Sequence, residues 1–363
     1  MGPYYTERIC YYKLKRMVLD QNNMNDSRVH VDESEPTGGE EYPFVKREVT
    51  IHSDRWVTDD YNISDVLLGR GKFGEVKECK HKVNGRQFAA KFIEVNDEEE
   101  RKDVVNEVAV MTGLQHPRLL QLYDAFESKN SFCLIMELIS GGELFERVIN
   151  DDFILTEKAC VMFMRQICEG VGFMHSRDIL HLDMKPENIL CLTREGNRIK
   201  IIDFGLARSY DPKDDLRVMF GTPEFMAPEI VNFDTISPST DMWSLGVVCY
   251  VLLSGLSPLL GETEAETLAN VTMATWDFNT VEFENISAEA KDFISKLLIK
   301  KPKDRMSCKT CLEHKWLRRS SKRDFLSERS LSKKKLRRFV FRRKWQKAVN
   351  AMLALKRMGV TLT

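Results

Sequence analysis

The chain has 363 residues, of which 43% are hydrophobic and 30% are charged. This length holds one large domain or two ordinary ones, and the composition is that of a soluble globular protein. The nine cysteines fit no disulfide spacing, and the first residues do not form a signal-peptide pattern. We therefore expect a reducing, cytoplasmic compartment.

The net charge of −1 conceals a strong asymmetry along the chain. Residues 329–363 contain 12 Lys or Arg and no Asp or Glu, which leaves 42 basic against 55 acidic residues in the first 328. The body therefore carries a charge of about −13, and the last 35 residues carry +12. Body and tail have charges of opposite sign.

In chain order, residues 1–55 are polar and aperiodic, which predicts a disordered extension. Order is expected to begin near Tyr61. From there to about Cys133 the segments are short and strand-like, with one helical run at roughly 97–114.

Beyond a linker at 137–142 the pattern becomes helical. Apolar residues between Cys160 and Met174 recur every three or four positions, and Ser287 precedes a second such stripe. The sequence thus predicts an α+β fold, with a small β-rich part before a larger helical part.

Two segments have alternative interpretations. Residues 242–260 are uncharged for 19 positions, long enough to span a bilayer, but Gly255 and Pro258 favour a buried helix followed by a turn. Cys308 and Cys311 form a Cys-x-x-Cys pair with no second pair, so helix-borne thiols are favoured over a zinc site.

Three glycines occur close together in Leu68-Gly69-Arg70-Gly71-Lys72-Phe73-Gly74-Glu75-Val76. Such a loop brings backbone N–H groups close to phosphates, and a dinucleotide site is one alternative. A helix would follow in a dinucleotide site, whereas 76–79 and 87–92 look like strands. Lys91 lies between apolar neighbours on the second of these strands, which favours an ATP site over a solvated lysine.

The most specific motifs follow in order. They are His181-Leu182-Asp183-Met184-Lys185-Pro186-Glu187-Asn188, Asp203-Phe204-Gly205, Ala227-Pro228-Glu229 and Asp241-Met242-Trp243-Ser244. With the glycine-rich stretch and Lys91, they make residues 61–317 resemble the protein kinase family. The resemblance implies a bilobal fold, with a β-rich N-lobe and a helical C-lobe.

The resemblance also implies roles for individual residues. Asp183 would accept the proton of the attacking hydroxyl, Lys185 would neutralise charge on the transferred group, and Asn188 and Asp203 would bind Mg²⁺. His181 would be structural, and Glu229 would pair with Arg305. ATP would be bound by Leu68, Gly69, Gly71, Gly74, Val76, Lys91, Glu107, Glu137 and Leu138, with Met136 behind the adenine. Within this set, Lys91 would be held by Glu107.

The expected substrate is a Ser or Thr hydroxyl in a basic peptide. Lys185 and the stretch around Thr222 resemble Ser/Thr-specific kinases, and Glu143 and Glu187 match positions that read basic residues. Their alternative is to be solvated surface acids. Leu182 departs from the family, since an Arg there normally binds an activation-loop phosphate. We therefore expect Ser209, Tyr210 and Thr222 to need no phosphorylation.

The tail predicts a basic amphipathic helix, which could bind a membrane surface, a nucleic acid or calmodulin. Trp345, Val349, Met352 and Met358 have the 1-5-8-14 spacing of calmodulin targets, beside Arg343 and Lys344. Behind a kinase domain, calmodulin is favoured over both a membrane and a nucleic acid.

Several stretches together resemble the myosin light chain kinase family. They are Arg342-Arg343-Lys344-Trp345-Gln346-Lys347, Gly221-Thr222-Pro223-Glu224-Phe225, Thr267-Leu268-Ala269-Asn270-Val271-Thr272 and His181-Leu182-Asp183. The resemblance implies a monomer that uses ATP and Mg²⁺, phosphorylates a serine of myosin regulatory light chain near actomyosin, and responds to Ca²⁺ through calmodulin.

We hypothesise that the segment 333–343, within a regulatory tail at 318–363, blocks an acidic substrate groove until calmodulin removes it. The alternatives are another calmodulin-dependent kinase of the death-associated or titin type, and an inactive calmodulin-responsive scaffold. The presence of Lys91, Glu107, Asp183, Asn188 and Asp203 argues against the scaffold.

Overall fold

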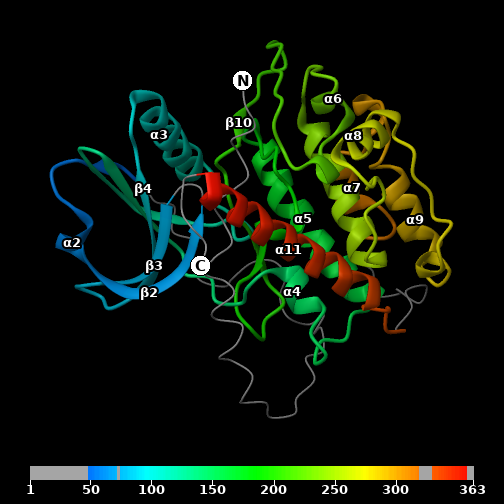
Figure 1. The fold of residues 1–363 in the computed structure, drawn as a ribbon, viewed down its shortest axis with the longest axis horizontal. Helices are drawn as coiled ribbons and strands as arrows, with labels where there is room; N and C mark the ends of the chain where they lie inside the picture. Colours follow the sequence, from blue (N-terminus) through cyan, green and yellow to red (C-terminus); the bar gives the residue numbers. More distant parts are fainter. Residues whose placement is uncertain (1–47, 72–73, 319–328, 358–363) are drawn as a thin grey trace.

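The computed structural model describes residues 48–71, 74–318 and 329–357. Within these residues the chain forms two lobes, with a helix of the tail lying across the larger one (Figure 1). The described N-lobe contains a six-stranded sheet in the order β1-β5-β6-β4-β3-β2. The strands are β1 (Ile51–His52), β2 (Tyr61–Gly71), β3 (Gly74–His81), β4 (Gln87–Glu94), β5 (Leu122–Ser128) and β6 (Ser131–Met136).

Helix α3 (Glu98–Gly113) is the main helix of the N-lobe and agrees with the helical run predicted at 97–114. It begins where the side chain of Asp97 accepts hydrogen bonds from the backbone N–H groups of Glu99 and Glu100. A shorter helix, α2 (Val57–Asp60), precedes β2.

The start of the ordered region differs from the prediction. Ile51 and His52 were expected in a disordered extension, but they form β1, which pairs in parallel with Ala125 and Phe126 of β5. His52 Nε2 also lies 3.0 Å from a carboxylate oxygen of Asp124. A two-residue strand has too short a pattern to be recognised without its partner strand.

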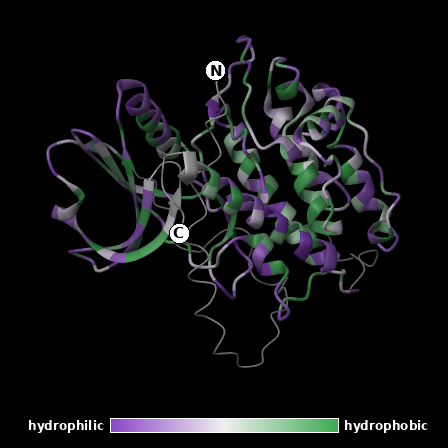
Figure 2. Ribbon diagram, viewed as in Figure 1, coloured by the Kyte–Doolittle hydropathy of each residue, from purple (hydrophilic) through white to green (hydrophobic). Residues whose placement is uncertain are grey.

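The C-lobe is built around α5 (Glu157–His175) and α7 (Pro238–Ser254), which pack against each other. Ser287 caps a helix as its position predicted, Thr156 caps α5 in the same way, and Phe163 and Trp243 are fully buried. Its other helices are α4 (Leu144–Val148), α6 (Pro228–Val231), α8 (Glu264–Met273), α9 (Ala288–Ser295) and α10 (Cys308–Glu313). Figure 2 shows hydrophobic colour concentrated along the central helices.

The uncharged run at 242–260 is a buried helix followed by a turn, as predicted. α7 is buried over most of its length and ends at Gly255, whose φ of 72° is readily adopted by glycine. In the described part of the chain, none of the helices is both long and apolar enough to cross a membrane. Cys308 and Cys311 are buried, free thiols of α10, which agrees with the interpretation as helix-borne thiols.

Short strands and turns of the C-lobe connect its helices, and several of them carry or flank the polar motifs. They are β7 (Ile179–Leu180), β8 (Ile189–Cys191), β9 (Ile199–Ile201), β10 (Arg208–Ser209), and the 3₁₀ turns Pro186–Asn188, Pro223–Phe225, Val281–Phe283 and Pro302–Asp304. The final helix is α11 (Lys334–Arg357), which crosses the face of the C-lobe (Figure 1).

Candidate active site

The N-lobe part of the site is built across three neighbouring strands. Gly69 of β2 pairs with Val76 of β3, and Val76 pairs with Lys91 of β4. A Cβ on Gly74 would lie 1.7 Å from the carbonyl oxygen of Phe92, and its φ is 116°, so this position requires glycine. Leu68 and Gly71 lie on the same strand as Gly69, which places the predicted ATP-binding residues together.

Lys91 is directed toward α3 by an ion pair. Its Nζ atom lies 2.7 Å from Oε1 of Glu107, and both side chains are largely buried. The pair links the sheet to α3, as the sequence predicted. It fixes an ammonium group beneath the glycine-rich strands, where it can meet phosphate oxygens.

The segment between the lobes begins at the end of β6. Met136 is buried there, and the backbone N–H of Glu137 donates to the carbonyl of Gln121 over 2.9 Å. Since this N–H is already used, any backbone contact from Glu137 to an adenine ring must come from its carbonyl oxygen. Leu138 follows directly.

Asp241 of α7 holds the loop that carries the most specific motif. Its carboxylate accepts the backbone N–H of His181 over 2.9 Å and that of Leu182 over 2.8 Å, and it lies 2.8 Å from Nε2 of His175. Burial opposes its ionisation, but hydrogen bonds and charge from His175 and His181 outweigh burial and lower the pKa of Asp241. This buried carboxylate fixes the loop from below.

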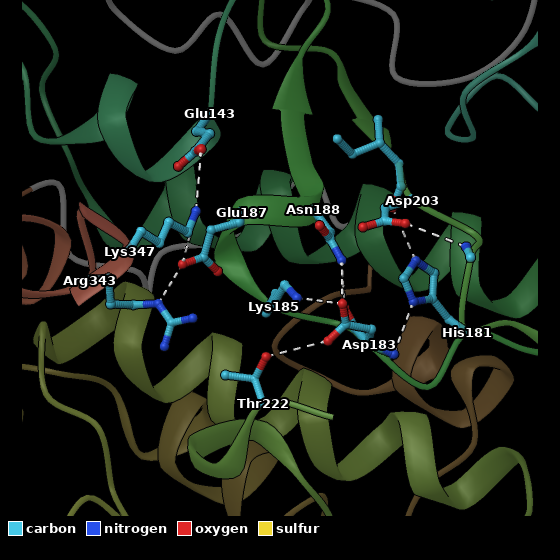
Figure 3. A network of polar contacts seen from close by, with 12 residues as sticks. Glu143, His181, Asp183, Lys185, Glu187, Asn188, Asp203, Thr222, Arg343 and Lys347 are labelled. Atoms are coloured by element: carbon cyan, nitrogen blue, oxygen red, sulfur yellow. Dashed lines mark hydrogen bonds and ion pairs between the residues drawn. The ribbon is translucent and has the colours of Figure 1, made fainter. Parts of the chain in front are cut away.

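Asp183 is the centre of the polar network in Figure 3. One carboxylate oxygen accepts from Nδ2 of Asn188 over 3.1 Å and from Nζ of Lys185, and the other lies 3.4 Å from the hydroxyl of Thr222. Asn188 also donates to the backbone carbonyl of Asp183 over 2.8 Å. Four residues predicted for catalysis or substrate binding are thus brought together from two segments.

Asp203 lies on the other side of the same loop. It follows β9 with a φ of 69°, and one of its oxygens accepts the N–H of Gly205 over 3.4 Å. His181 packs edge-on against Phe204, with ring centroids 5.8 Å apart, and its Nε2 lies 3.3 Å from the carbonyl oxygen of Ile202. His181 is therefore a buried structural residue, as predicted.

The donor set fits a magnesium ion bound together with a nucleotide. Asp203 offers carboxylate oxygens, and Asn188, whose NH₂ group faces Asp183, offers its amide oxygen. Among the described residues, no cluster of three or more His, Cys, Asp and Glu side chains is placed to hold a metal without a substrate. Mg²⁺ commonly completes its coordination with waters and substrate phosphates, so this sparse set suits it.

Leu182 lies in an apolar cluster that holds the activation segment, which runs from Asp203-Phe204-Gly205 to Ala227-Pro228-Glu229. It is 5% exposed and packs with Leu180, Val218, Ile230 and Ile236. Part-buried side chains of the same segment surround the cluster: Tyr210, Leu216, Phe220 and Met226. At the position of Leu182 related kinases commonly have an arginine that binds a phosphate of this segment. Here hydrophobic contacts fix the segment instead.

A second attachment of this segment is ionic and fully buried. Arg305 donates to both carboxylate oxygens of Glu229, over 2.7 and 2.8 Å, as the sequence predicted. Thr240 completes the group with a hydrogen bond of 2.9 Å to Glu229. A bidentate pair with its remaining donors satisfied ties the end of the segment to the C-lobe.

Four glutamates form an acidic groove that the basic side of α11 occupies, and Figure 3 shows two of them, Glu143 and Glu187, facing Lys347 and Arg343. Arg342 lies 2.7 Å and Arg343 lies 3.2 Å from Glu224. The other contacts are Arg343 to Glu187, Lys347 to Glu187 at 3.5 Å, Lys347 to Glu143 at 3.9 Å and Lys344 to Glu146 at 2.9 Å. These contacts place α11 over the acids predicted to read substrate.

The electrostatics of this groove follow from burial and pairing. Burial opposes ionisation of Glu187, but the charges of Arg343 and Lys347 outweigh burial and lower the pKa of Glu187 to about 2. Arg343 is itself nearly enclosed between Glu187 and Glu224. Both partners therefore remain charged in the docked helix at neutral pH.

The groove-binding part of the tail overlaps the predicted segment only at Arg342 and Arg343. The sequence placed residues 333–343 in the groove, but the residues that reach the glutamates are 342–347. Residues 333–340 lie on the helices of the C-lobe, because Leu336, Phe339 and Val340 bury their side chains there. Apolar burial decides where this part of the tail lies.

Among the predicted calmodulin-binding residues, the apolar ones and the basic ones lie on different sides of α11. Trp345 is 70% exposed and Met352 is 42% exposed, while Val349 is half-buried. Arg343 and Lys344 face the kinase lobe through their ion pairs, and Met358 lies outside the described residues. The apolar stripe of the helix thus faces away from the lobe.

Three residues of the site were not assigned from the sequence. Glu224 and Glu146 complete the acidic groove, and Asp241 fixes the loop. Glu224 and Asp241 both stand inside motifs that carried the family resemblance, so their position was a usable signal. Glu146 is an ordinary surface glutamate by sequence, and the docked helix alone reveals its contact.

The protein kinase domain family model matches residues 63–317. Myosin light chain kinase family member 4 from Homo sapiens is 52% identical over 276 residues, which cover 76% of this chain and 71% of that protein. The chain belongs to the protein kinase family, and within it to the myosin light chain kinases.

Larger relatives share the same region. Smooth muscle myosin light chain kinase from Gallus gallus is 48% identical over 88% of this chain, and myosin light chain kinase 3 from Rattus norvegicus is 50% identical over 87%. The chain spans 17% and 40% of the lengths of these two relatives.

Solved structures show the same fold. The autoregulated twitchin kinase fragment from C. elegans superposes with a TM-score of 0.79 at 40% identity, covering 84% of this chain and 67% of that one. The autoinhibited serine kinase domain of titin gives 0.74 at 39% identity, covering 78% and 87%. The bilobal fold predicted from the sequence is thereby confirmed.

Proposed function

We propose that this kinase domain, residues 61–317, transfers the γ-phosphoryl group of ATP to a serine of myosin regulatory light chain. We further propose that the tail, residues 318–363, inhibits it until Ca²⁺-loaded calmodulin binds. The proposal is supported by membership of the myosin light chain kinases and by the arrangement around Asp183 and the acidic groove.

The proposed chemistry assigns one task to each residue. Asp183 accepts the proton of the serine hydroxyl, and the hydroxyl of Thr222, 3.4 Å away, orients its carboxylate. Lys185 and Lys91 offer positive charge to the phosphoryl oxygens, with Lys91 held by Glu107. Bound through Asp203 and Asn188, Mg²⁺ would neutralise charge on the transferred phosphate.

The proposed substrate is a basic peptide segment. Glu143, Glu187 and Glu224 would receive its Lys or Arg side chains in the groove that α11 now occupies. A groove of carboxylates beside the catalytic group selects positively charged partners and repels acidic ones. The same contacts explain how a basic tail can exclude the substrate.

The proposed activator removes this tail. Calmodulin is acidic and grips basic amphipathic helices through apolar anchors, which here would be Trp345, Val349, Met352 and Met358. Its acidic side chains would compete with the glutamates of the groove for Arg343 and Lys344. The proposal places the enzyme in the cytoplasm with actomyosin, as a monomer without a nucleic-acid partner.

The observation that carries this proposal is Arg343 between Glu187 and Glu224, next to Asp183. The test is phosphate transfer from ATP to purified regulatory light chain, with and without Ca²⁺/calmodulin. We expect transfer to one serine, abolished when that serine is replaced by alanine, and at least a tenfold increase with calmodulin. Equal rates in both conditions would refute the regulation, and no transfer would refute the substrate.

A further inference from the structure

The first part of the tail is built into the C-lobe. Leu331 donates its N–H to the carbonyl of Leu155 over 2.8 Å, and Ser330 forms a β-bridge with Thr156. The Nζ atom of Lys333 donates to the backbone carbonyls of Asn150 and Phe153. These backbone contacts attach residues 329–333 to the loop between α4 and α5.

The first turns of α11 continue this attachment. Leu336, Phe339 and Val340 are at most 5% exposed, and they belong to the main hydrophobic core. A Cβ on Gly255 would lie 2.2 Å from the backbone nitrogen of Leu336, so α11 passes directly over the end of α7. Arg337 adds hydrogen bonds of 2.9 and 3.0 Å to the carbonyl of Ile149.

From Phe341 onward the same helix is attached differently. Leu336, Val340, Arg343 and Lys347 fall on one face of an α-helix, so the inner face changes from apolar to basic along its length. The large apolar side chains that follow lie about 150° round from that face. They are exposed: Phe341 by 57%, Trp345 by 70% and Met352 by 42%.

We propose that calmodulin displaces the helix only from Phe341 onward, and that residues 329–340 stay on the C-lobe in both states. This inference rests on the proposed function. It follows from the two kinds of contact. Residues 329–340 bury their apolar side chains in the core of the C-lobe, whereas the part from Phe341 onward exposes its large apolar side chains to solvent. The chain would therefore bend near Val340 when the kinase is activated.

Thermodynamic linkage gives the test, in the full chain. If Leu336 keeps its contacts in both states, Leu336→Ala destabilises both equally and leaves their balance unchanged. Basal activity and the calmodulin concentration for half-activation should then stay within about twofold of wild type, while the melting temperature falls. If residues 329–340 left with the rest, the substitution would shift the balance toward the displaced state about 30-fold or more, so basal activity would rise to near the fully activated rate.

Arg343→Ala is the matched control in the part that moves. It removes a groove contact and should raise basal activity at least fivefold, whereas Leu336→Ala does not. If Leu336→Ala does not yield folded kinase, Leu336→Val removes less volume at the same position and repeats the measurement.

The outcomes are distinguishable. A wild-type kinase that calmodulin does not activate would overturn the proposed function and this inference with it. A wild-type kinase that is activated, together with a large rise in the basal activity of Leu336→Ala, would overturn the inference alone.

Discussion

The activation segment contacts Asp183 through Thr222, and Arg343 of α11 is close enough for the charge of Asp183 to act on it, but the two regions are held by different contacts. The activation segment is fixed by the apolar cluster around Leu182 and by the buried pair of Glu229 with Arg305. From Phe341 onward, α11 reaches the lobe mainly through ion pairs with four glutamates, and its large apolar side chains face solvent.

This difference between apolar packing and ion pairing indicates which of the two regions can be displaced. Burying an apolar side chain contributes about 1.5–3 kcal/mol, and the charge of a partner does not compete for that contact. An ion pair gains less after desolvation, and another polyanion can replace the glutamates. If the activation segment stays packed in this way, the proposed switch lies elsewhere, in the ionic part of α11.

The largest expected effect is at Asp183, where the two regions meet. Asp183→Asn removes the proposed proton acceptor but keeps hydrogen bonds to Asn188 and Thr222. We expect kcat to fall by about 10³-fold, within the usual range for general-base groups, in both the basal and the activated enzyme. Steady-state kinetics would measure this, with an unchanged melting temperature as the control. A loss below tenfold would contradict the assignment.

The second prediction breaks the ionic contact alone. Arg343→Glu places a carboxylate between Glu187 and Glu224, so the docked helix loses its best-buried pair and gains repulsion. We expect calmodulin-independent activity to rise by about tenfold or more. Arg338→Glu makes the same change on an exposed residue of α11 and should leave basal activity within twofold. Equal effects of the two variants would exclude a specific contact.

The third prediction separates the two halves of α11 by stability. A chain ending at Val340 keeps the buried Leu336 and Phe339, whereas a chain ending at Arg318 loses them and exposes the surface beneath. We expect the melting temperature of the shorter chain to be about 5–10 °C below that of the longer one. Calorimetry would test this, and equal melting temperatures would show that the residues between Arg318 and Val340 do not stabilise the kinase domain.

The smallest expected effect is on the activation segment. Since Leu182 packs in an apolar cluster and cannot bind a phosphate, phosphatase treatment should change the rate of the calmodulin-activated enzyme by less than twofold. Mass spectrometry must confirm that Ser209, Tyr210 and Thr222 are unmodified after treatment. A loss of activity on dephosphorylation would mean that the apolar cluster does not suffice.

Local patterns explain what the sequence could predict. Helix α3 was located to within a residue, since Asp97 caps it and Val104, Val108 and Met111 recur at helical spacing. The polar network around Asp183 follows from short motifs whose residues stand within a few positions of each other. The pairs of Lys91 with Glu107 and Glu229 with Arg305 required the family resemblance, since they join distant segments.

The errors arose where a distant partner decides the structure. Strand β1 exists through pairing with β5, some seventy residues later. The sequence prediction brought the tail into the groove one helical turn or more too early, because net charge does not reveal that Leu336, Phe339 and Val340, at a spacing of three and four residues, bury their side chains. That three-and-four spacing was a visible sign of a buried face.

The central claim is that the part of α11 beyond Val340 is an ionic, removable inhibitor. The most direct test is the rate of phosphate transfer to regulatory light chain with Ca²⁺/calmodulin divided by the rate without it, for the full chain and for a chain ending at Val340. We predict a ratio of about ten or more for the full chain and about one for the shorter chain, which should match the activated rate in both conditions. A shorter chain that is inactive, or that still responds to calmodulin, would contradict the account.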